Sequence, residues 1–297
     1  MCLLVVVTRP DSATPLLVGA NRDERLERPA TAVTVLRDAT PRILGGRDEE
    51  AGGTWLAVNE HGVVAGLTNR PSPDGRDPSK RSRGELPLAL AQHRDARSAV
   101  EEFVTRFRAA DYNPAWLLVG DRTSLFALDM TGAGPGAGGA GPGGAGPGGA
   151  GPGGGRPVVE ELGPGVHILE NNPLHTGSPK QAHVRELLGD LDALEGAGLM
   201  DRLRSVLVDH TVPAAGPRAV SDDDGEEQTV DRDRPVDQPG GRPVETLAAC
   251  VHTDAYGTRS STLVGVPAAP GLLPRVLVAD GHPCTSRYVD VTDLFET

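Results

Sequence analysis

The residue best suited to covalent chemistry is Cys2, which follows Met1 and begins the apolar run Cys2-Leu-Leu-Val-Val-Val-Thr8. Methionine aminopeptidase removes Met when the next residue is small, as cysteine is. The processed chain would then carry a thiol and an α-amine on one residue, with ordinary pKa values of about 8.5 and about 8. The amine can take the proton of the thiol, which predicts a nucleophile. The alternative is that Cys2 is a small buried hydrophobic residue, the usual role of an unpaired cysteine.

Polar residues follow the second apolar run, Leu16–Ala20, where Asn21-Arg-Asp-Glu24 come directly after it. The short link between the two runs predicts a hairpin, which brings the end of the second strand beside the start of the first. Arg22 would then lower the pKa of the Cys2 thiol and stabilise negative charge, while Asp23 would orient the α-amine. The alternative is a solvated strand end with a local ion pair.

The composition limits the compartment and the class of partner. The 297 residues carry a formal charge of −12, which argues against nucleic acid and anionic membranes because both bind basic surfaces. Three cysteines form no disulfide framework and suit a reducing compartment. Neither a signal peptide nor a membrane span is visible, so we expect a cytoplasmic protein without membrane insertion. The high content of Gly and Pro, with few aromatic residues, is typical of a GC-rich bacterial genome.

The pattern of apolar runs predicts an α+β fold. Many short strand-like runs alternate with two groups of helical spacing, which favours a four-layer αββα sandwich of two antiparallel sheets. The predicted helices are 85–92, 96–108, 181–191 and 199–209. The predicted strands are 3–8, 16–20, 54–58, 63–67, 115–119, 124–130, 166–170, 247–251, 262–266, 275–279 and 287–291.

Two segments have compositions that cannot form a packed core. Residues 131–156 are almost entirely Gly, Ala and Pro, and residues 213–244 are acidic and rich in Pro. Strand-like runs resume on both sides of each segment. We therefore expect a low-complexity loop and a disordered loop inserted into one domain that spans residues 1–297.

Five motifs occur in an order that resembles the NRDE family, also called the transport and Golgi organisation protein 2 family. They are Gly19-Ala-Asn-Arg-Asp-Glu-Arg25, Gly52-Gly-Thr-Trp-Leu56, Gly62-Val-Val-Ala-Gly-Leu-Thr-Asn69, Arg83-Gly-Glu-Leu86 and Tyr256-Gly-Thr-Arg259. The resemblance covers nearly the whole chain except the two low-complexity segments. It implies an N-terminal nucleophile (Ntn) hydrolase fold, similar to that of the cysteine acylases that cleave penicillin V or conjugated bile salts.

The same resemblance implies a set of site residues. Cys2 matches the nucleophile of those acylases, and Arg22 and Asp23 match an Arg and an Asp beside it, with a different spacing. Asn69 and Asn171 resemble side-chain amides of an oxyanion hole, and Arg259 would add a second positive charge. The alternatives are turn or strand-end caps for the two asparagines and a surface charge for Arg259.

These residues predict a cysteine amidohydrolase that cleaves a linear or cyclic C–N amide of a small-molecule substrate, without a cofactor. The alternative from the same resemblance is a non-catalytic carrier of haem or of a lipid or acyl group, with haem as its ligand. A third possibility is a scaffold role for the acidic segment Asp222–Asp237. The sequence leaves open the substrate and the oligomeric state.

No metal site is expected from the sequence. The eight histidines are scattered, and none forms a pair with metal-ligand spacing beside an acidic residue. Cys250 and His252 alternate along a predicted strand and would share one face of it, but two ligands do not make a site. Cys250 and Cys284 are therefore interpreted as core or surface thiols.

Overall fold

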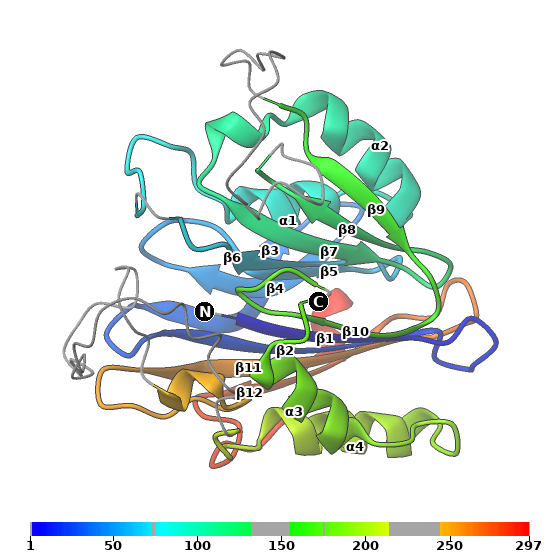
Figure 1. The fold of residues 1–297 in the computed structure, drawn as a ribbon. Helices are drawn as coiled ribbons and strands as arrows, with labels where there is room; N and C mark the ends of the chain where they lie inside the picture. Colours follow the sequence, from blue (N-terminus) through cyan, green and yellow to red (C-terminus); the bar gives the residue numbers. More distant parts are fainter. Residues whose placement is uncertain (1, 73–74, 132–154, 175, 214–243, 297) are drawn as a thin grey trace, which may run out of the picture.

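The computed structural model describes residues 2–72, 75–131, 155–174, 176–213 and 244–296. Two antiparallel sheets lie face to face, and a pair of helices covers the outer face of each sheet (Figure 1). This arrangement confirms the predicted four-layer αββα sandwich. The predicted segments 131–156 and 213–244 lie almost entirely outside the described residues.

The first sheet carries the N-terminal strand second from one edge. Its six strands are arranged in the order β10-β1-β2-β11-β12-β13. The neighbours of β1 are therefore β2, which follows it in a hairpin, and β10, which is distant in sequence. The strands are β1 (Cys2–Thr8), β2 (Leu16–Arg25), β10 (Gly165–Leu169), β11 (Tyr256–Val266), β12 (Arg275–Asp280) and β13 (Val289–Asp290).

The second sheet is a seven-stranded meander in which each strand pairs with the next along the chain. The short links after Asn59 and after Gly120 join antiparallel neighbours, as predicted. The strands are β3 (Ala30–Arg37), β4 (Ile43–Asp48), β5 (Leu56–Asn59), β6 (Val64–Asn69), β7 (Ala115–Gly120), β8 (Leu125–Asp129) and β9 (Val158–Leu162).

Helices α1 (Glu85–Leu90) and α2 (Ala96–Arg106) cover the second sheet, and α3 (Pro179–Leu188) and α4 (Gly196–Leu207) cover the first (Figure 1). Side-chain caps fix two of the helix starts. Asp95 accepts a hydrogen bond from the Ser98 amide at the start of α2. Ser178 accepts one from the Gln181 amide at the start of α3, where Pro179 occupies the first turn.

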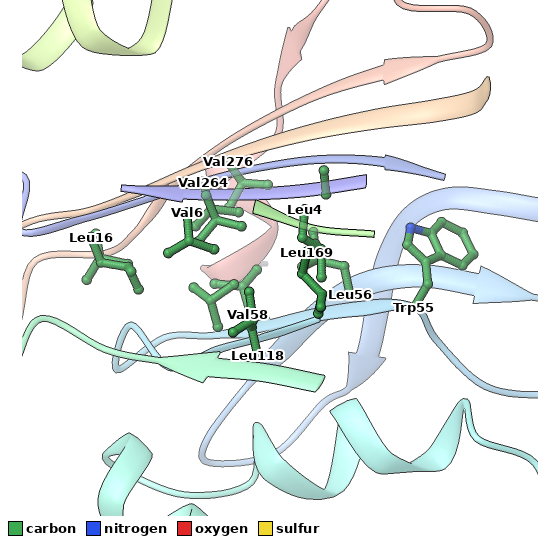
Figure 2. Close-up of a cluster of buried hydrophobic side chains, with 14 of the residues drawn as sticks. Leu4, Val6, Leu16, Trp55, Leu56, Val58, Leu118, Leu169, Val264 and Val276 are labelled. Atoms are coloured by element: carbon green, nitrogen blue, oxygen red, sulfur yellow. The ribbon is translucent and has the colours of Figure 1, made fainter. Parts of the chain in front are cut away.

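The main core lies between the two sheets, where alternate residues of each strand face inward. Figure 2 shows part of this cluster, with Leu4, Val6 and Leu16 of the first sheet facing Leu56, Val58 and Leu118 of the second. Leu4 packs on Gly66, where an added Cβ would lie 2.7 Å from a Leu4 methyl carbon. Each fully buried leucine here contributes about 2–5 kcal/mol against truncation to alanine.

Some sequence predictions were wrong. Residues 247–251, predicted as a strand, begin with the last residue of a short 3₁₀ helix (Val244–Leu247) and have no strand pairing of their own. Strand β2 does not end at Ala20 but continues through Arg25, because β11 pairs with it along its whole length. Three strands were missed, namely β3, β4 and β9. None of the helices in the described ranges has the length and apolar character needed to span a membrane.

Candidate active site

Cys2 lies at one end of the first sheet, where it pairs directly with Arg22 of β2. On its other side, Leu4 pairs with Leu169, the last residue of β10, and Asn171 follows in the bend beyond that strand. The Cys2 side chain packs against the core between the sheets. The nucleophile candidate therefore lies opposite Arg22, at the end of the sheet near which Asn171 follows β10.

Arg22 is held rigidly although it is charged and only 3% exposed. Its Nη2 atom donates to Asp48 Oδ2 at 3.1 Å, and its guanidinium lies 4.5 Å from the centre of the Trp55 ring. Trp55 can approach because residue 46 is glycine, where a Cβ would lie 1.9 Å from a ring carbon. The Arg22 Nη1 atom is buried and has no hydrogen-bond partner among the described residues.

The environment of the Cys2 thiol favours its protonated form. Burial raises the pKa of this thiol above its ordinary value, and the Asp23 carboxylate raises it further, whereas the chain's amino group and Arg22 act in the opposite direction. A thiol in this state needs a base to become a nucleophile.

Asp23 is buried on the side of the sheet that faces α3 and α4. Its Oδ1 atom accepts a hydrogen bond from the Thr258 hydroxyl at 2.6 Å, and its Oδ2 atom lies 3.7 Å from Lys180 Nζ. Burial raises the pKa of Asp23, while Lys180 and Thr258 act to lower it. The carboxylate therefore lies one residue from Arg22 but on the opposite face of β2.

Lys180 is a site residue that the sequence analysis missed. It is fully buried, and its Nζ atom also donates to the Thr246 carbonyl at 3.2 Å. A signal was present in the sequence, because Lys180, Val184 and Leu188 follow a four-residue spacing along α3 and all three are buried. A lysine on the apolar stripe of a helix needs a buried partner, which here is Asp23.

Asn171 links the Cys2 end of the first sheet to the end of β6 in the second. Its Nδ2 atom donates to the main-chain carbonyl of Asn69, and its buried Oδ1 atom has no partner in the described parts of the chain. A primary amide has two N–H groups, so one remains for a ligand. Asn69 thus holds Asn171 through its main chain.

Successive side chains of β6 point to opposite faces of its sheet. The Thr68 side chain, and not that of Asn69, lies on the inner face between the two sheets, where the Cys2 side chain also lies. Gly66 faces Leu4 between the sheets, so Thr68, two residues further along β6, faces the same way and Asn69 the opposite way. Thr68 is fully buried, and its hydroxyl has no hydrogen-bond partner within the described ranges. Sequence reasoning missed it, since a threonine within a strand gives no functional signal.

The hydrogen bonds of Arg259 are made with the turn that follows β2. Its Nη1 atom donates to the main-chain carbonyls of Arg25, Leu26 and Arg28, and so fastens the turn after β2. The role of Arg259 as a second positive charge at the site stays a prediction. Its observed hydrogen bonds hold the end of β2, the strand that carries Arg22 and Asp23.

Known proteins resemble this chain at two levels. Among solved structures, a variant of conjugated bile acid hydrolase from Clostridium perfringens matches with a TM-score of 0.44 and 10% identity, covering 98% of this chain and 96% of that one. A Caenorhabditis elegans N-acylethanolamine-hydrolyzing acid amidase ortholog matches with a TM-score of 0.49 and 12% identity, covering 91% and 94%.

Comparison of amino-acid sequences identifies the family of this chain. The Transport and Golgi organization 2 homolog of Mus musculus is 28% identical over 282 residues, which cover 90% of this chain and 89% of the mouse protein. The Homo sapiens homolog is 27% identical over 280 residues, with the same coverage. The sequence profile of the family described as Transport and Golgi organisation 2 matches residues 1–269. The chain therefore belongs to the Transport and Golgi organisation 2 family.

Proposed function

We propose that the protein is a cysteine amidohydrolase of the Ntn type, which cleaves a non-peptide C–N amide with Cys2 as its N-terminal residue after removal of Met1. The observation that carries this proposal is the pairing of Cys2 with Arg22, at the end of the first sheet near which Asn171 follows β10. The buried atoms Arg22 Nη1, Asn171 Oδ1 and Thr68 Oγ1 lack hydrogen-bond partners among the described residues. Each such atom costs about 1–3 kcal/mol, a cost that a bound substrate would offset.

The reaction begins with transfer of the thiol proton of Cys2 to its own α-amine. The thiolate attacks the amide carbonyl carbon, and the carbonyl oxygen becomes an oxyanion. Asn171 Nδ2 donates a hydrogen bond to this oxyanion, and the Arg22 guanidinium stabilises its charge. When the intermediate collapses, the C–N bond breaks and the amine product leaves with the proton from the α-ammonium group.

The remaining acyl group is a thioester on Cys2 Sγ. The α-amine then takes a proton from water, and the resulting hydroxide attacks the thioester carbonyl. Collapse of the second intermediate releases a carboxylic acid and restores the thiol. In this cycle Asp23 orients the α-amine and stabilises its protonated form, while Lys180 balances the charge of Asp23. A free thiol nucleophile needs a reducing compartment, so we place the protein in the cytoplasm.

The test combines intact mass with trapping of the acyl-enzyme. Purified protein is incubated with a library of small-molecule amides and quenched in acid, and the modified peptide is sequenced by mass spectrometry. We expect a chain that lacks Met1 and an acyl adduct on Cys2. The Cys2→Ser variant should keep slow turnover with an ester adduct, and Cys2→Ala should lose both.

Three results would contradict the proposal. The first is a retained Met1 in active protein, and the second is an adduct on Cys250 or Cys284 instead of Cys2. The third is reversible binding of haem or a lipid that persists in Cys2→Ala, with no turnover by the wild type. This third result would establish the carrier function instead.

A further inference from the structure

A cluster of cysteine and histidine side chains lies at the end of the first sheet where β11 begins and β12 ends, outside the proposed active site. The Cys250 and Cys284 Sγ atoms are 3.9 Å apart. His252 Nε2 lies 3.4 Å from Cys250 Sγ and 3.1 Å from Cys284 Sγ. Two more histidines border these three residues. His282 has a ring nitrogen within 4.8 Å of Cys250 and His252, and His210 has one within 4.8 Å of His252 and Cys284.

The distances among Cys250, His252 and Cys284 resemble those between ligands of one tetrahedral metal ion. Zinc binds thiolate sulfur at about 2.3 Å and imidazole nitrogen at about 2.0–2.1 Å, so tetrahedral geometry separates two sulfurs by about 3.8 Å and a sulfur from a nitrogen by about 3.6 Å. The observed separations of 3.9 Å between the sulfurs and 3.4 Å between Cys250 and His252 lie close to these values, while that of 3.1 Å between Cys284 and His252 is shorter. A disulfide would require an S–S distance of about 2.05 Å.

His282 is the better placed of the two candidate fourth ligands. Its Nδ1 atom is buried and has no hydrogen-bond partner among the described residues, whereas His210 is exposed. Its ring stacks on that of His252, with centres 4.1 Å apart. It also packs on Gly257, where an added Cβ would lie 2.9 Å from the ring. A buried imidazole nitrogen without a partner is costly, and coordination would satisfy it.

We propose that Cys250, His252, His282 and Cys284 bind one Zn²⁺ ion in a closed, structural site. Two thiolates and two imidazoles are an established ligand set for structural zinc. The thiolates supply two negative charges that balance the charge of the ion, and their two protons leave to solvent on binding.

The ion would join the segment before β11 to the loop after β12. The first segment continues into the hydrogen-bond network of Asp23, because the Val251 amide donates to Thr258 Oγ1 at 2.8 Å and Thr258 donates to Asp23. The Cys250 amide also donates to the Asp209 carbonyl at 2.7 Å, beyond the end of α4. Zinc would therefore stabilise the segment whose hydrogen bonds, through Thr258, hold Asp23.

The proposed site differs from the expectation that Cys250 and Cys284 are core or surface thiols. Sequence spacing could not reveal the site because the ligands come from two segments about thirty residues apart and the first of them is not a strand. The sequence does contain a close pair of ligands in each half, Cys250-Val-His252 and His282-Pro-Cys284, but each pair has one intervening residue, whereas zinc sites usually have two or more.

The experiment uses the full-length chain, reduced and stripped of metal with a chelator. Zinc is titrated in competition with a chromophoric chelator, and Co²⁺ serves as the spectroscopic probe. We expect one equivalent of tight binding, thiolate-to-cobalt charge transfer and the strong visible bands of tetrahedral Co²⁺. Zinc should also raise the melting temperature, since it binds the folded state. It should protect Cys250 and Cys284, but not Cys2, from alkylation.

Variants separate the ligands from their neighbours. Cys250→Ser, Cys284→Ser and His282→Ala should each weaken binding by at least about 100-fold, because loss of even an outer partner of a ligand costs roughly 10–100-fold. His210→Ala is the matched control and should bind zinc like the wild type. If a variant fails to fold, zinc protection of the wild-type thiols still decides the question.

The proposal is overturned if the reduced wild type shows no stoichiometric binding or if the Cys250→Ser/Cys284→Ser double variant keeps it. A disulfide between these cysteines in protein purified under reducing conditions would also overturn it. Binding lost in His210→Ala but retained in His282→Ala would refute His282 as the fourth ligand.

Discussion

Lys180 Nζ lies 3.7 Å from Asp23 Oδ2, and the two side chains are only 1% and 0% exposed. This ion pair connects α3 to the strand that carries Arg22. Removal of one partner leaves the other as an unpaired buried charge, which costs about 3–5 kcal/mol. We therefore predict that Lys180→Met lowers the free energy of unfolding by this amount, as measured by urea denaturation.

A matched control is available in Lys80, which is not fully buried and donates to the Tyr112 carbonyl at 3.2 Å. Lys80→Met should cost no more than about 1.5 kcal/mol, the scale of one hydrogen bond. The double variant Asp23→Asn/Lys180→Met should be more stable than Lys180→Met alone. Equal losses in the free energy of unfolding in Lys180→Met and Lys80→Met would show that the buried ion pair contributes no more than one hydrogen bond.

Asp48 makes the stability of the site depend on pH. Burial acts to raise its pKa, but hydrogen bonds from Arg28 and the Ala51 amide, with the charges of Arg28 and Arg22, hold it below the ordinary value of 3.8. Ionised Asp48 therefore stabilises the folded state. This contribution is fully present above pH 3.8, the unfolded value, and is lost as the pH falls through the lower folded pKa.

We predict that Asp48→Asn lowers the free energy of unfolding at neutral pH by about 1.5–3 kcal/mol, the scale of hydrogen bonds to a charged group. The difference from the wild type should shrink below pH 3.8. Urea denaturation across this range measures it. Asp38→Asn is the control, because Asp38 pairs with Arg42 while 78% exposed and should contribute less than about 1 kcal/mol. A pH-independent difference between Asp48→Asn and the wild type would refute the linkage.

Asn171 and its neighbour Asn172 offer a matched pair for the oxyanion role. Asn171 is buried and donates to the Asn69 carbonyl, whereas Asn172 is exposed and donates to Glu170 Oε1 at 3.1 Å. We predict that Asn171→Ala slows acylation of Cys2 by a chromogenic acyl anilide by about 10²–10³-fold. Asn172→Ala should react at the wild-type rate, and equal rates in the two variants would remove Asn171 from the mechanism.

Thr68 should show opposite effects on stability and on rate. Its hydroxyl is buried without a partner in the described ranges, so Thr68→Val should raise the free energy of unfolding by about 1 kcal/mol or more. The same change should slow acylation if the hydroxyl contacts substrate. In the control Thr54, Oγ1 donates to the Leu56 carbonyl at 2.7 Å, and Thr54→Val should be destabilising. A destabilised Thr68→Val would mean that this hydroxyl has a structural partner.

Local patterns predicted the first hairpin and its consequence. The turn-rich link between two apolar runs indicated an antiparallel pair, and the pair brings Cys2 opposite Arg22. The strands missed by the sequence analysis have specific reasons. Gly45 and Gly46 weaken the strand signal of β4, yet the close approach of Leu56 and Trp55 requires them. β9 is an edge strand with exposed glutamates, so its apolar alternation is weak.

The sequence by itself determined the nucleophile candidate, the layered fold and the polar strand end, because these depend on contacts between neighbouring segments. Tertiary structure decided that Lys180 balances Asp23, that Thr68 shares the face of Cys2, and that Cys250, His252 and Cys284 meet. These residues come from distant parts of the sequence. The pairing and packing of the strands brings them together, and no local spacing in the sequence reveals this. The packing of the two sheets therefore decides which of the chain's polar groups share a site.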